Sequence, residues 1–186
     1  ICAFVANAVF DGTGAIMLSG ESAMGKYPVQ CVETMTRIAT AVEASINYGR
    51  RFKRREYDLE TKNYEFYLAH SICSTALQMN AKAIFAYTEC GDTPKLLSSF
   101  LPCCPIYAVT SKEKTYKQLA LAWDVTPILV KEDVPAKELI AKGIEVAKQA
   151  GYVASGDIVA IAGGESILPG NKDDVMNRTV GGVIRI

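Results

Sequence analysis

Over most of the chain, short continuous apolar runs alternate with segments in which apolar residues recur every three or four positions. The runs are AIFAYT (83–88), PIYAVT (105–110), TPILV (126–130) and DIVAIAGG (157–164). Apolar runs that alternate with helical segments predict parallel strands covered on both faces. A last run, VGGVIRI (180–186), follows without a helical segment and predicts an antiparallel edge strand. The pattern predicts a three-layer α/β/α fold around a mostly parallel five-stranded sheet.

The segments between these runs have the periodicity of amphipathic helices. They predict helices over residues 64–80, 93–100, 112–122 and 135–150.

The first 48 residues follow a different pattern. VANAVF predicts a helix, AIMLS (Ala15–Ser19) a short strand, and GES a turn. A second helix is predicted over 28–47, because Pro28 suits a first helical turn and apolar residues then repeat every three or four positions. Its apolar stripe would be exposed if nothing packed against it, and such a stripe marks an interface.

A charged stretch, GRRFKRREYDLETK (49–62), separates this part from the rest and has almost no apolar periodicity. It predicts an exposed linker. The expected organisation is therefore a first segment over 1–48, a linker over 49–62 and an α/β domain over 63–186.

Composition excludes several classes of function. The 20 basic and 20 acidic residues balance, whereas a nucleic-acid-binding protein needs a basic surface. No apolar run approaches the roughly 18 residues of a membrane span. Six cysteines without a CxxC pair and a single histidine argue against a zinc site. They favour reduced thiols and a cytoplasmic location.

Three loops follow the carboxyl ends of predicted strands, where ligands bind in parallel sheets: TECGDT (88–93), TSKEKT (110–115) and GGESILPGNKDD (163–174). The first two also begin helices, whose N–H groups favour anions. Their threonines could hold a ligand or simply cap the helices, and the residues alone leave both readings open.

Several blocks resemble pyruvate kinases over essentially the whole chain. VANAVFDGTGAIMLSGESAMGKYPVQCVETM, with MLSGES followed by GKYP, is similar to the end of their catalytic (β/α)8 barrel. AHSICSTALQMNAKAI, CPIYAVT and SGDIVAIAGG are similar to their C-terminal domain, in the same order. The resemblance implies that 1–48 is the last strand and helix of a barrel and that 63–186 is the C-terminal α/β domain.

The resemblance also implies the setting of the chain. Members of the family transfer phosphate from phosphoenolpyruvate to ADP in glycolysis, use Mg²⁺ and K⁺, and form cytosolic homotetramers under allosteric control. Ser19, Glu21 and Lys26 match a block that borders the nucleotide side of the family's active site. The family's catalytic lysine, catalytic threonine and metal-binding carboxylates belong to barrel segments that these 186 residues do not contain. We therefore expect no complete catalytic site, no metal site and no kinase activity from these residues alone.

The turn at 88–93 resembles the effector turn of sugar-phosphate-regulated members, which reads roughly Thr-x-Ser-Gly-x-Thr. Cysteine replaces the serine, and both variable positions are acidic. A carboxylate about 5 Å from a phosphate charge costs roughly 3 kcal/mol at an effective dielectric constant near 20. An anion pocket of doubtful affinity is therefore expected. Its residues would be Thr88, Glu89, Cys90, Gly91, Asp92 and Thr93, with Lys112, Gly170 and Lys172 from the neighbouring loops.

Three hypotheses follow. The chain is a regulatory and assembly portion of a pyruvate kinase that self-associates through 1–48. Alternatively, it is a stand-alone small-anion-binding domain of the same fold that acts outside glycolysis. The third hypothesis is a catalytic piece that works only with the missing barrel in trans.

Overall fold

The structure is a computed structural model that describes residues 2–55, 63–131, 136–163 and 180–186. Contacts between residues divide the chain into two compact units, Ile1–Tyr48 and Gly49–Ile186. Among the described residues, no helix is both long enough and apolar enough to cross a membrane.

The first unit is helical, with α1 (Cys2–Asp11), α2 (Gly20–Ala23) and α3 (Pro28–Ser45). The α1 and α2 helices both contact α3. Val5 is the one buried hydrophobic residue described in this unit, and α3 has no buried residue. Three helices with so little apolar burial do not form a core of their own.

The predicted strand at Ala15–Ser19 is wrong, because these residues have no regular secondary structure. A strand needs a neighbouring strand to satisfy its backbone N–H and C=O groups. The described part of this unit contains helices and connections only, so the apolar run has no ladder to join.

The predicted exposed linker also differs from the structure. Its first part belongs to helix α4 (Tyr48–Arg54), and Phe52 in that helix is buried in a core of the second unit. Arginine and lysine are good helix formers, and one buried aromatic side chain is enough to anchor a short helix. Residues 56–62 of the predicted linker lie outside the described residues.

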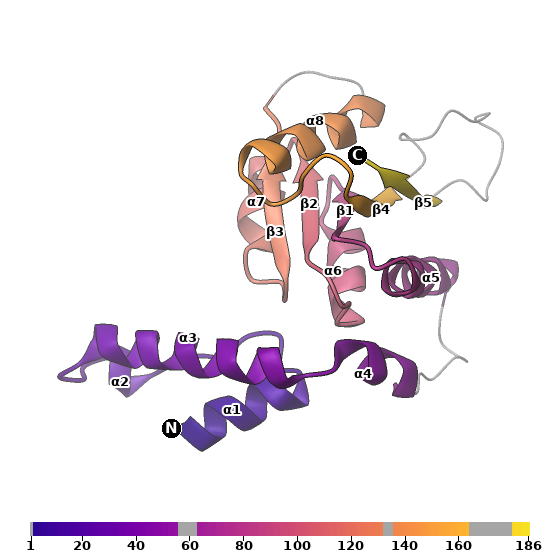
Figure 1. Ribbon diagram of the computed structural model, residues 1–186. Coiled ribbons are helices and arrows are strands. Elements are labelled where there is room, and N and C mark those ends of the chain that lie inside the picture. The colour runs from indigo at the N-terminus through magenta and orange to yellow at the C-terminus, as the bar shows by residue number, and fades with distance from the viewer. Residues whose placement is uncertain (1, 56–62, 132–135, 164–179) are drawn as a thin grey trace. The chain divides into compact units, whose positions relative to one another are not determined.

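The second unit contains a five-stranded sheet in the order β3-β2-β1-β4-β5. Its strands and helices follow one another along the chain (Figure 1). They are α5 (Tyr64–Gln78), β1 (Ala83–Tyr87), α6 (Asp92–Ser99), β2 (Ile106–Thr110), α7 (Glu113–Leu119), β3 (Val125–Leu129), α8 (Ala136–Gln149), β4 (Ile158–Gly163) and β5 (Val180–Arg185).

The first four strands pair in parallel, and β5 pairs antiparallel with β4. In register, Ile84 lies opposite Ile106 of β2 and Ala160 of β4. The predicted sheet with its antiparallel edge strand is confirmed. All residues of β1 and β2 are buried, because their apolar runs face a helical layer on each side.

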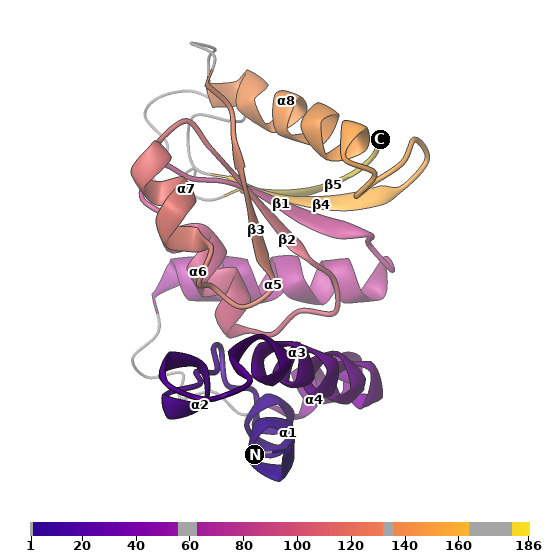
Figure 2. The ribbon, with the colours of Figure 1, turned by 90° about the vertical axis from the view of Figure 1, so that its left-hand side faces the viewer.

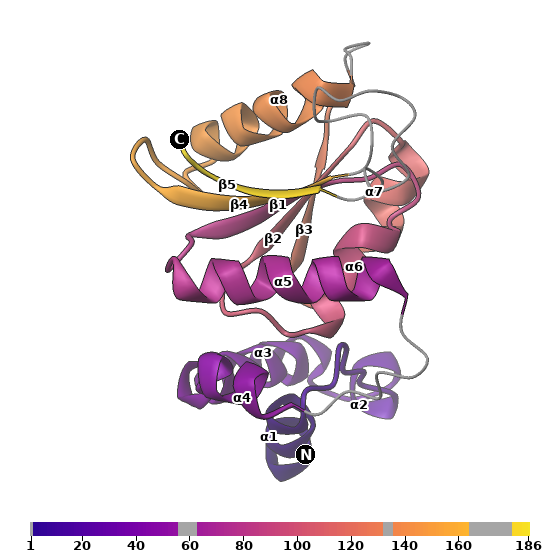
Figure 3. The same cartoon turned by 90° about the vertical axis from the view of Figure 1, so that its right-hand side faces the viewer.

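Helices cover the sheet on both faces (Figures 2 and 3). One core packs side chains of α5, α6 and α7 against one face and includes Phe66, Leu97 and Leu119. The other core packs α8 against the opposite face through Leu139, Ile140 and Ile144. The three-layer α/β/α architecture is therefore confirmed.

Strand β3 forms one edge of the sheet and contains a proline. Ile106 N–H donates to Asp124 O and Val130 N–H donates to Thr110 O, both at 3.0 Å. Even-numbered residues of β3 thus bond to β2, and odd-numbered ones, including Pro127, face the free edge. An edge is where a strand tolerates proline, since the missing N–H has no partner to lose.

Candidate functional site

The candidate turn at 88–93 connects β1 to α6 through Gly91. Gly91 is the N-terminal cap residue of α6 and has φ 94°, in the left-handed region. A Cβ added there would lie 3.3 Å from Leu119 Cδ2, so the backbone of the turn runs close against α7. Both the dihedral angle and the close approach explain a glycine at this position.

Internal hydrogen bonds involve the Thr88 hydroxyl of this turn and two threonine hydroxyls of the next loop. Gly91 N–H donates to Thr88 Oγ1 at 2.8 Å, and Thr88 is buried. Thr115 Oγ1 donates to Glu89 O at 2.5 Å, which joins the loop after β2 to the turn after β1. In the second loop Thr110 Oγ1 accepts from Lys112 N–H at 3.1 Å. The structure thus brings the two predicted loops together, and three of their threonines cap and brace the backbone.

The two acidic residues of the turn have different surroundings. Tyr87 Oη donates to Glu89 Oε1 at 3.1 Å. Burial, followed by this contact with the Glu89 carboxylate, raises the pKa of Tyr87 to about 12. The phenol therefore remains a neutral donor across the physiological range and holds Glu89 beside the end of β1.

Asp92 lines a cavity between the start of α6 and the start of α5. The cavity has a volume of about 360 Å³. The residues around it are Asn63, Glu65, Ala69, Ile72, Asp92, Thr93 and Leu96. Two carboxylates and no lysine or arginine belong to this lining, so the cavity disfavours an anion on electrostatic grounds.

Sequence reasoning missed the α5 residues of this cavity. Asn63 caps α5 by accepting from Phe66 N–H at 3.1 Å, and Glu65 lies in the first turn of the same helix. Such residues have the ordinary signature of a helix start. No signal in the sequence connects them with a turn that comes some 25 residues later.

The other candidate residues are more scattered. Cys90 and Lys112 are exposed, while Gly170 and Lys172 lie outside the described residues. In the first unit Ser19 N–H donates to Glu21 Oε2 at 3.2 Å, whereas Lys26 Nζ lies 5.4 Å from the centre of the Tyr27 ring. No hydrogen bond or ion pair found within residues 2–55 joins Lys26 to the other two.

Metal binding can be tested against the side chains present. Mg²⁺ needs several oxygen ligands arranged around one point. Across the described ranges, no group of three or more histidine, cysteine, aspartate or glutamate residues is placed to hold a metal ion. These residues do not fit a metal site, so no chemistry is assigned to one here.

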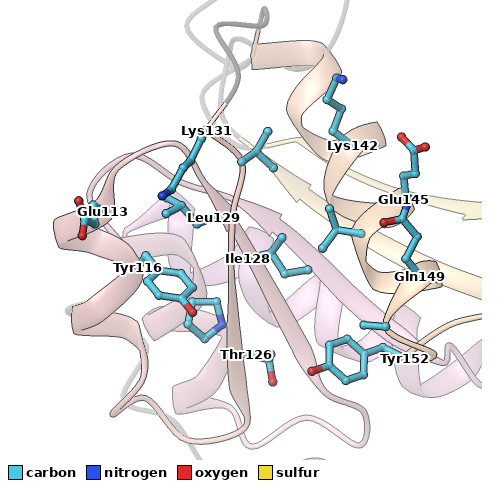
Figure 4. A pocket seen from close by; sticks show the side chains of 14 residues that line it. Glu113, Tyr116, Thr126, Ile128, Leu129, Lys131, Lys142, Glu145, Gln149 and Tyr152 are labelled. Atoms are coloured by element: carbon cyan, nitrogen blue, oxygen red, sulfur yellow. The ribbon is translucent and has the colours of Figure 1, made fainter.

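A second concave surface lies at the edge of the sheet, beside β3 and between α7 and α8 (Figure 4). Its volume is about 960 Å³. Tyr116 and Tyr152 line opposite sides of it, and Lys131 and Lys142 lie toward the carboxyl end of β3. This groove includes no residue of the 88–93 turn.

The described structure combines an α/β/α domain built on a mostly parallel sheet with a helical unit that has little core of its own. Comparison with known proteins places both parts in one family. Residues 67–176 match the family described as "Pyruvate kinase, alpha/beta domain", and residues 2–32 match "Pyruvate kinase, barrel domain". The chain belongs to the pyruvate kinase family.

Individual relatives agree with this assignment. The chain is 42% identical over 160 residues to a pyruvate kinase of Clostridium acetobutylicum, covering 86% of this chain and 34% of that protein. It is 41% identical to one of Sporosarcina psychrophila, covering 86% of this chain and 27% of the relative. A crystal structure of a Cryptosporidium parvum pyruvate kinase superposes with a TM-score of 0.85 and 27% identity, covering 99% of this chain and 35% of that one. The chain thus spans between about a quarter and a third of the length of such relatives.

Proposed function

We propose that this chain is the regulatory and assembly portion of a pyruvate kinase and has no kinase activity by itself. The parent reaction, implied by the family, is phosphate transfer from phosphoenolpyruvate to ADP in glycolysis. The observation that supports this proposal is the uneven match to the family. The α/β domain is matched over residues 67–176, but the barrel only over residues 2–32. Ser19, Glu21 and Lys26 cannot by themselves position two substrates, and phosphoryl transfer depends on such positioning.

The purified 186-residue chain is expected to give no turnover with phosphoenolpyruvate, ADP, Mg²⁺ and K⁺. Pyruvate formation would be followed by coupling to lactate dehydrogenase. The Clostridium acetobutylicum relative, assayed in parallel, shows that the coupling system works. Turnover by the chain above the blank would overturn the proposal of an inactive portion.

The 88–93 turn is proposed as an effector-type pocket with weak affinity for phosphate. Its architecture resembles an anion site, because a β-strand leads through a glycine into the start of a helix. Its chemistry opposes one, since Thr88 Oγ1 already accepts from Gly91 N–H and Thr115 Oγ1 already donates to Glu89 O. Asp92 also lines a cavity together with Glu65. The fixed position of Glu89 beside Tyr87 keeps a second negative charge at the turn.

Sugar phosphates are therefore expected to raise the melting temperature of the chain little or not at all at low salt. The ligands to compare are fructose 1,6-bisphosphate, ribose 5-phosphate, AMP and inorganic phosphate. The double variant Glu89→Gln/Asp92→Asn should gain a stabilising response to phosphate, because it removes two negative charges and keeps the shape of the turn. A large stabilisation of the unmodified chain would contradict the assignment of weak affinity.

Assembly is proposed to use the first unit. Phe4, Met17 and Met24 are 81%, 87% and 91% exposed, and Val29 and Val32 of α3 are exposed as well. So many large apolar side chains exposed within one small unit support an interface with another chain.

We expect the chain to self-associate in sedimentation velocity experiments and the variant Met24→Asp/Val29→Asp to do so less. Leu121→Asp is the control, because Leu121 is 81% exposed, between Val29 at 63% and Met24 at 91%, but belongs to the second unit. Equal effects of the two changes would show that association does not run through the first unit.

A further inference from the structure

The groove beside β3 has a chemistry that the proposed function does not use. It follows the chain from Thr126 to Lys131, and its two sides come from α7 and from α8 with the residues after it (Figure 4). At about 3.3 Å per residue, this stretch extends over roughly 16 Å. The volume of about 960 Å³ lies at the upper end of the range for small-molecule sites. The groove therefore suits an extended ligand better than a compact one.

The middle of the groove is apolar and its two sides are aromatic. Strand β3 contributes the half-buried Pro127 and the buried Ile128. Figure 4 shows Tyr116 and Tyr152 on opposite sides of β3, with their hydroxyl ends turned toward the strand. The Tyr152 ring is stacked on Tyr107, with 5.2 Å between the ring centres and 12° between the planes. Flat apolar surfaces thus lie on both sides of the strand.

Five polar side chains of the groove can donate hydrogen bonds to a ligand. They are Tyr116 Oη, Thr126 Oγ1, Lys131 Nζ, the Gln149 amide and Tyr152 Oη. Within the part of the chain that the structure describes, none of the five forms a hydrogen bond or an ion pair with another protein atom. The 88–93 turn differs, because Thr88 Oγ1 there already accepts from Gly91 N–H. The groove is prepared for a ligand that carries acceptors.

The charges that line the groove balance. Two lysines and two glutamates belong to the lining: Lys131, Lys142, Glu113 and Glu145. Glu113 is also paired with Lys117 of the same helix, with 2.9 Å between Oε1 and Nζ. A lining with equal numbers of both signs does not select a strongly charged ligand. Apolar contact and hydrogen bonding therefore decide what binds.

The backbone of β3 disfavours a peptide that pairs as a further strand. Pro127 has no N–H, and Val125 N–H already donates to Ala122 O at 3.3 Å. Among the strand residues that face the free edge, only Leu129 has an N–H left to offer. A peptide bound here must take its donors from side chains. A polyproline II helix meets this condition, because it has no internal hydrogen bonds and its carbonyl groups are open to solvent.

We propose that the groove binds a proline-rich peptide segment in the polyproline II conformation. Such a helix rises about 3.1 Å per residue, so five or six residues cover the roughly 16 Å of the groove. Its proline rings pack against Tyr116 and Tyr152, and its carbonyl groups accept from the tyrosine hydroxyls and from Gln149. Aromatic-lined grooves recognise proline-rich segments in this way. The fixed backbone of the peptide reduces the entropy lost on binding.

This proposal is independent of the effector proposal and of kinase activity. The groove contains no residue of the 88–93 turn, and none of Ser19, Glu21 and Lys26 lines it. A failure of either assignment at those sites would leave the peptide groove unaffected, and the reverse also holds.

The test adds a capped oligoproline of about ten residues to the isotope-labelled whole chain and follows the backbone amide signals by NMR. Saturable shifts should appear at the groove, at Tyr116, Leu129, Gln149 and Tyr152. A capped glycine–serine peptide of the same length is flexible and has to be ordered on binding. It should bind at least about 5-fold more weakly.

Three variants examine the contacts. Tyr116→Ala should weaken the binding of oligoproline at least about 5-fold, as the loss of an aromatic anchor does. Thr126→Val keeps the shape of the side chain, removes a hydroxyl donor and should weaken binding about 2- to 10-fold. Tyr64→Ala is the control, because Tyr64 is 46% exposed on α5 and lies outside the groove. It should leave the affinity unchanged.

The proposal is overturned by an absence of saturable shifts, by shifts confined to residues outside the groove, or by equal affinities of Tyr116→Ala and Tyr64→Ala. Equal binding of the glycine–serine peptide would also overturn the assignment to polyproline II. Circular dichroism confirms that each variant is folded. The map of shifts on the unmodified chain decides the question even if Tyr116→Ala does not fold.

Discussion

Replacing Phe100 with alanine is expected to lower the free energy of unfolding of the chain by about 3–5 kcal/mol. Phe100 is 1% exposed, and its ring centre lies 4.9 Å from that of Phe66, 5.6 Å from His70 and 6.4 Å from Phe52. Removing the ring leaves a cavity that α4, α5 and α6 all border. Urea denaturation followed by circular dichroism measures the change.

The same substitution should also loosen α4. Phe52 stacks on His70 at 4.8 Å, and Arg55 Nη1 donates to Ser99 O at 2.6 Å, so α4 is held on the domain next to Phe100. Amide exchange over residues 48–54 should therefore increase more than exchange in β1. Leu121→Ala is the control, since Leu121 is 81% exposed and should cost less than about 0.5 kcal/mol. A loss below about 1 kcal/mol for Phe100→Ala would contradict the assigned packing.

Gly143→Ala is the second large effect that we expect, with a net loss of about 1–3 kcal/mol. An added Cβ would lie 2.3 Å from Val109 Cγ2 and 3.0 Å from Val109 Cγ1, and the first distance is too short for two non-bonded carbon atoms. Alanine is the better helix former by about 1 kcal/mol, and this gain offsets only part of the clash. Thermal and urea denaturation measure the result.

A double-mutant cycle with Val109→Ala separates the clash from other effects. Val109 is fully buried in β2, so Val109→Ala alone should also be destabilising. The double variant Gly143→Ala/Val109→Ala should be more stable than the sum of the two single losses predicts, because the smaller residue makes room for the new methyl group. Additive losses would show that α8 does not rest on Val109.

The five strands were predictable because each is a compact apolar run, and burial on both faces produces that pattern. The strand expected at Ala15–Ser19 is absent, because an apolar run forms a strand only where a neighbouring strand can pair with it. Its sequence is apolar, but no described strand of the first unit can pair with it. Phe52 was missed because one aromatic residue among basic ones gives no periodicity, and its contacts come from α5 and α6.

The candidate turn was located correctly between β1 and α6, and its link to the next loop followed from parallel topology. The direction of its side chains was not predictable. The bond from Tyr87 to Glu89 and the cavity shared by Asp92 and Glu65 depend on side-chain geometry.

Pro127 makes the two edges of the sheet unequal. At the β3 edge Val125 N–H already donates to Ala122 O and Pro127 has no N–H to offer, so an added strand would find few donors there. The β5 edge, Val180–Arg185, contains no proline. If strands of other molecules could pair at both edges of the sheet, molecules would add without limit and build fibrils. If they can pair at one edge only, two molecules joined by that edge leave no edge for a third. The proline in β3 therefore protects the domain against fibrillar aggregation at high concentration.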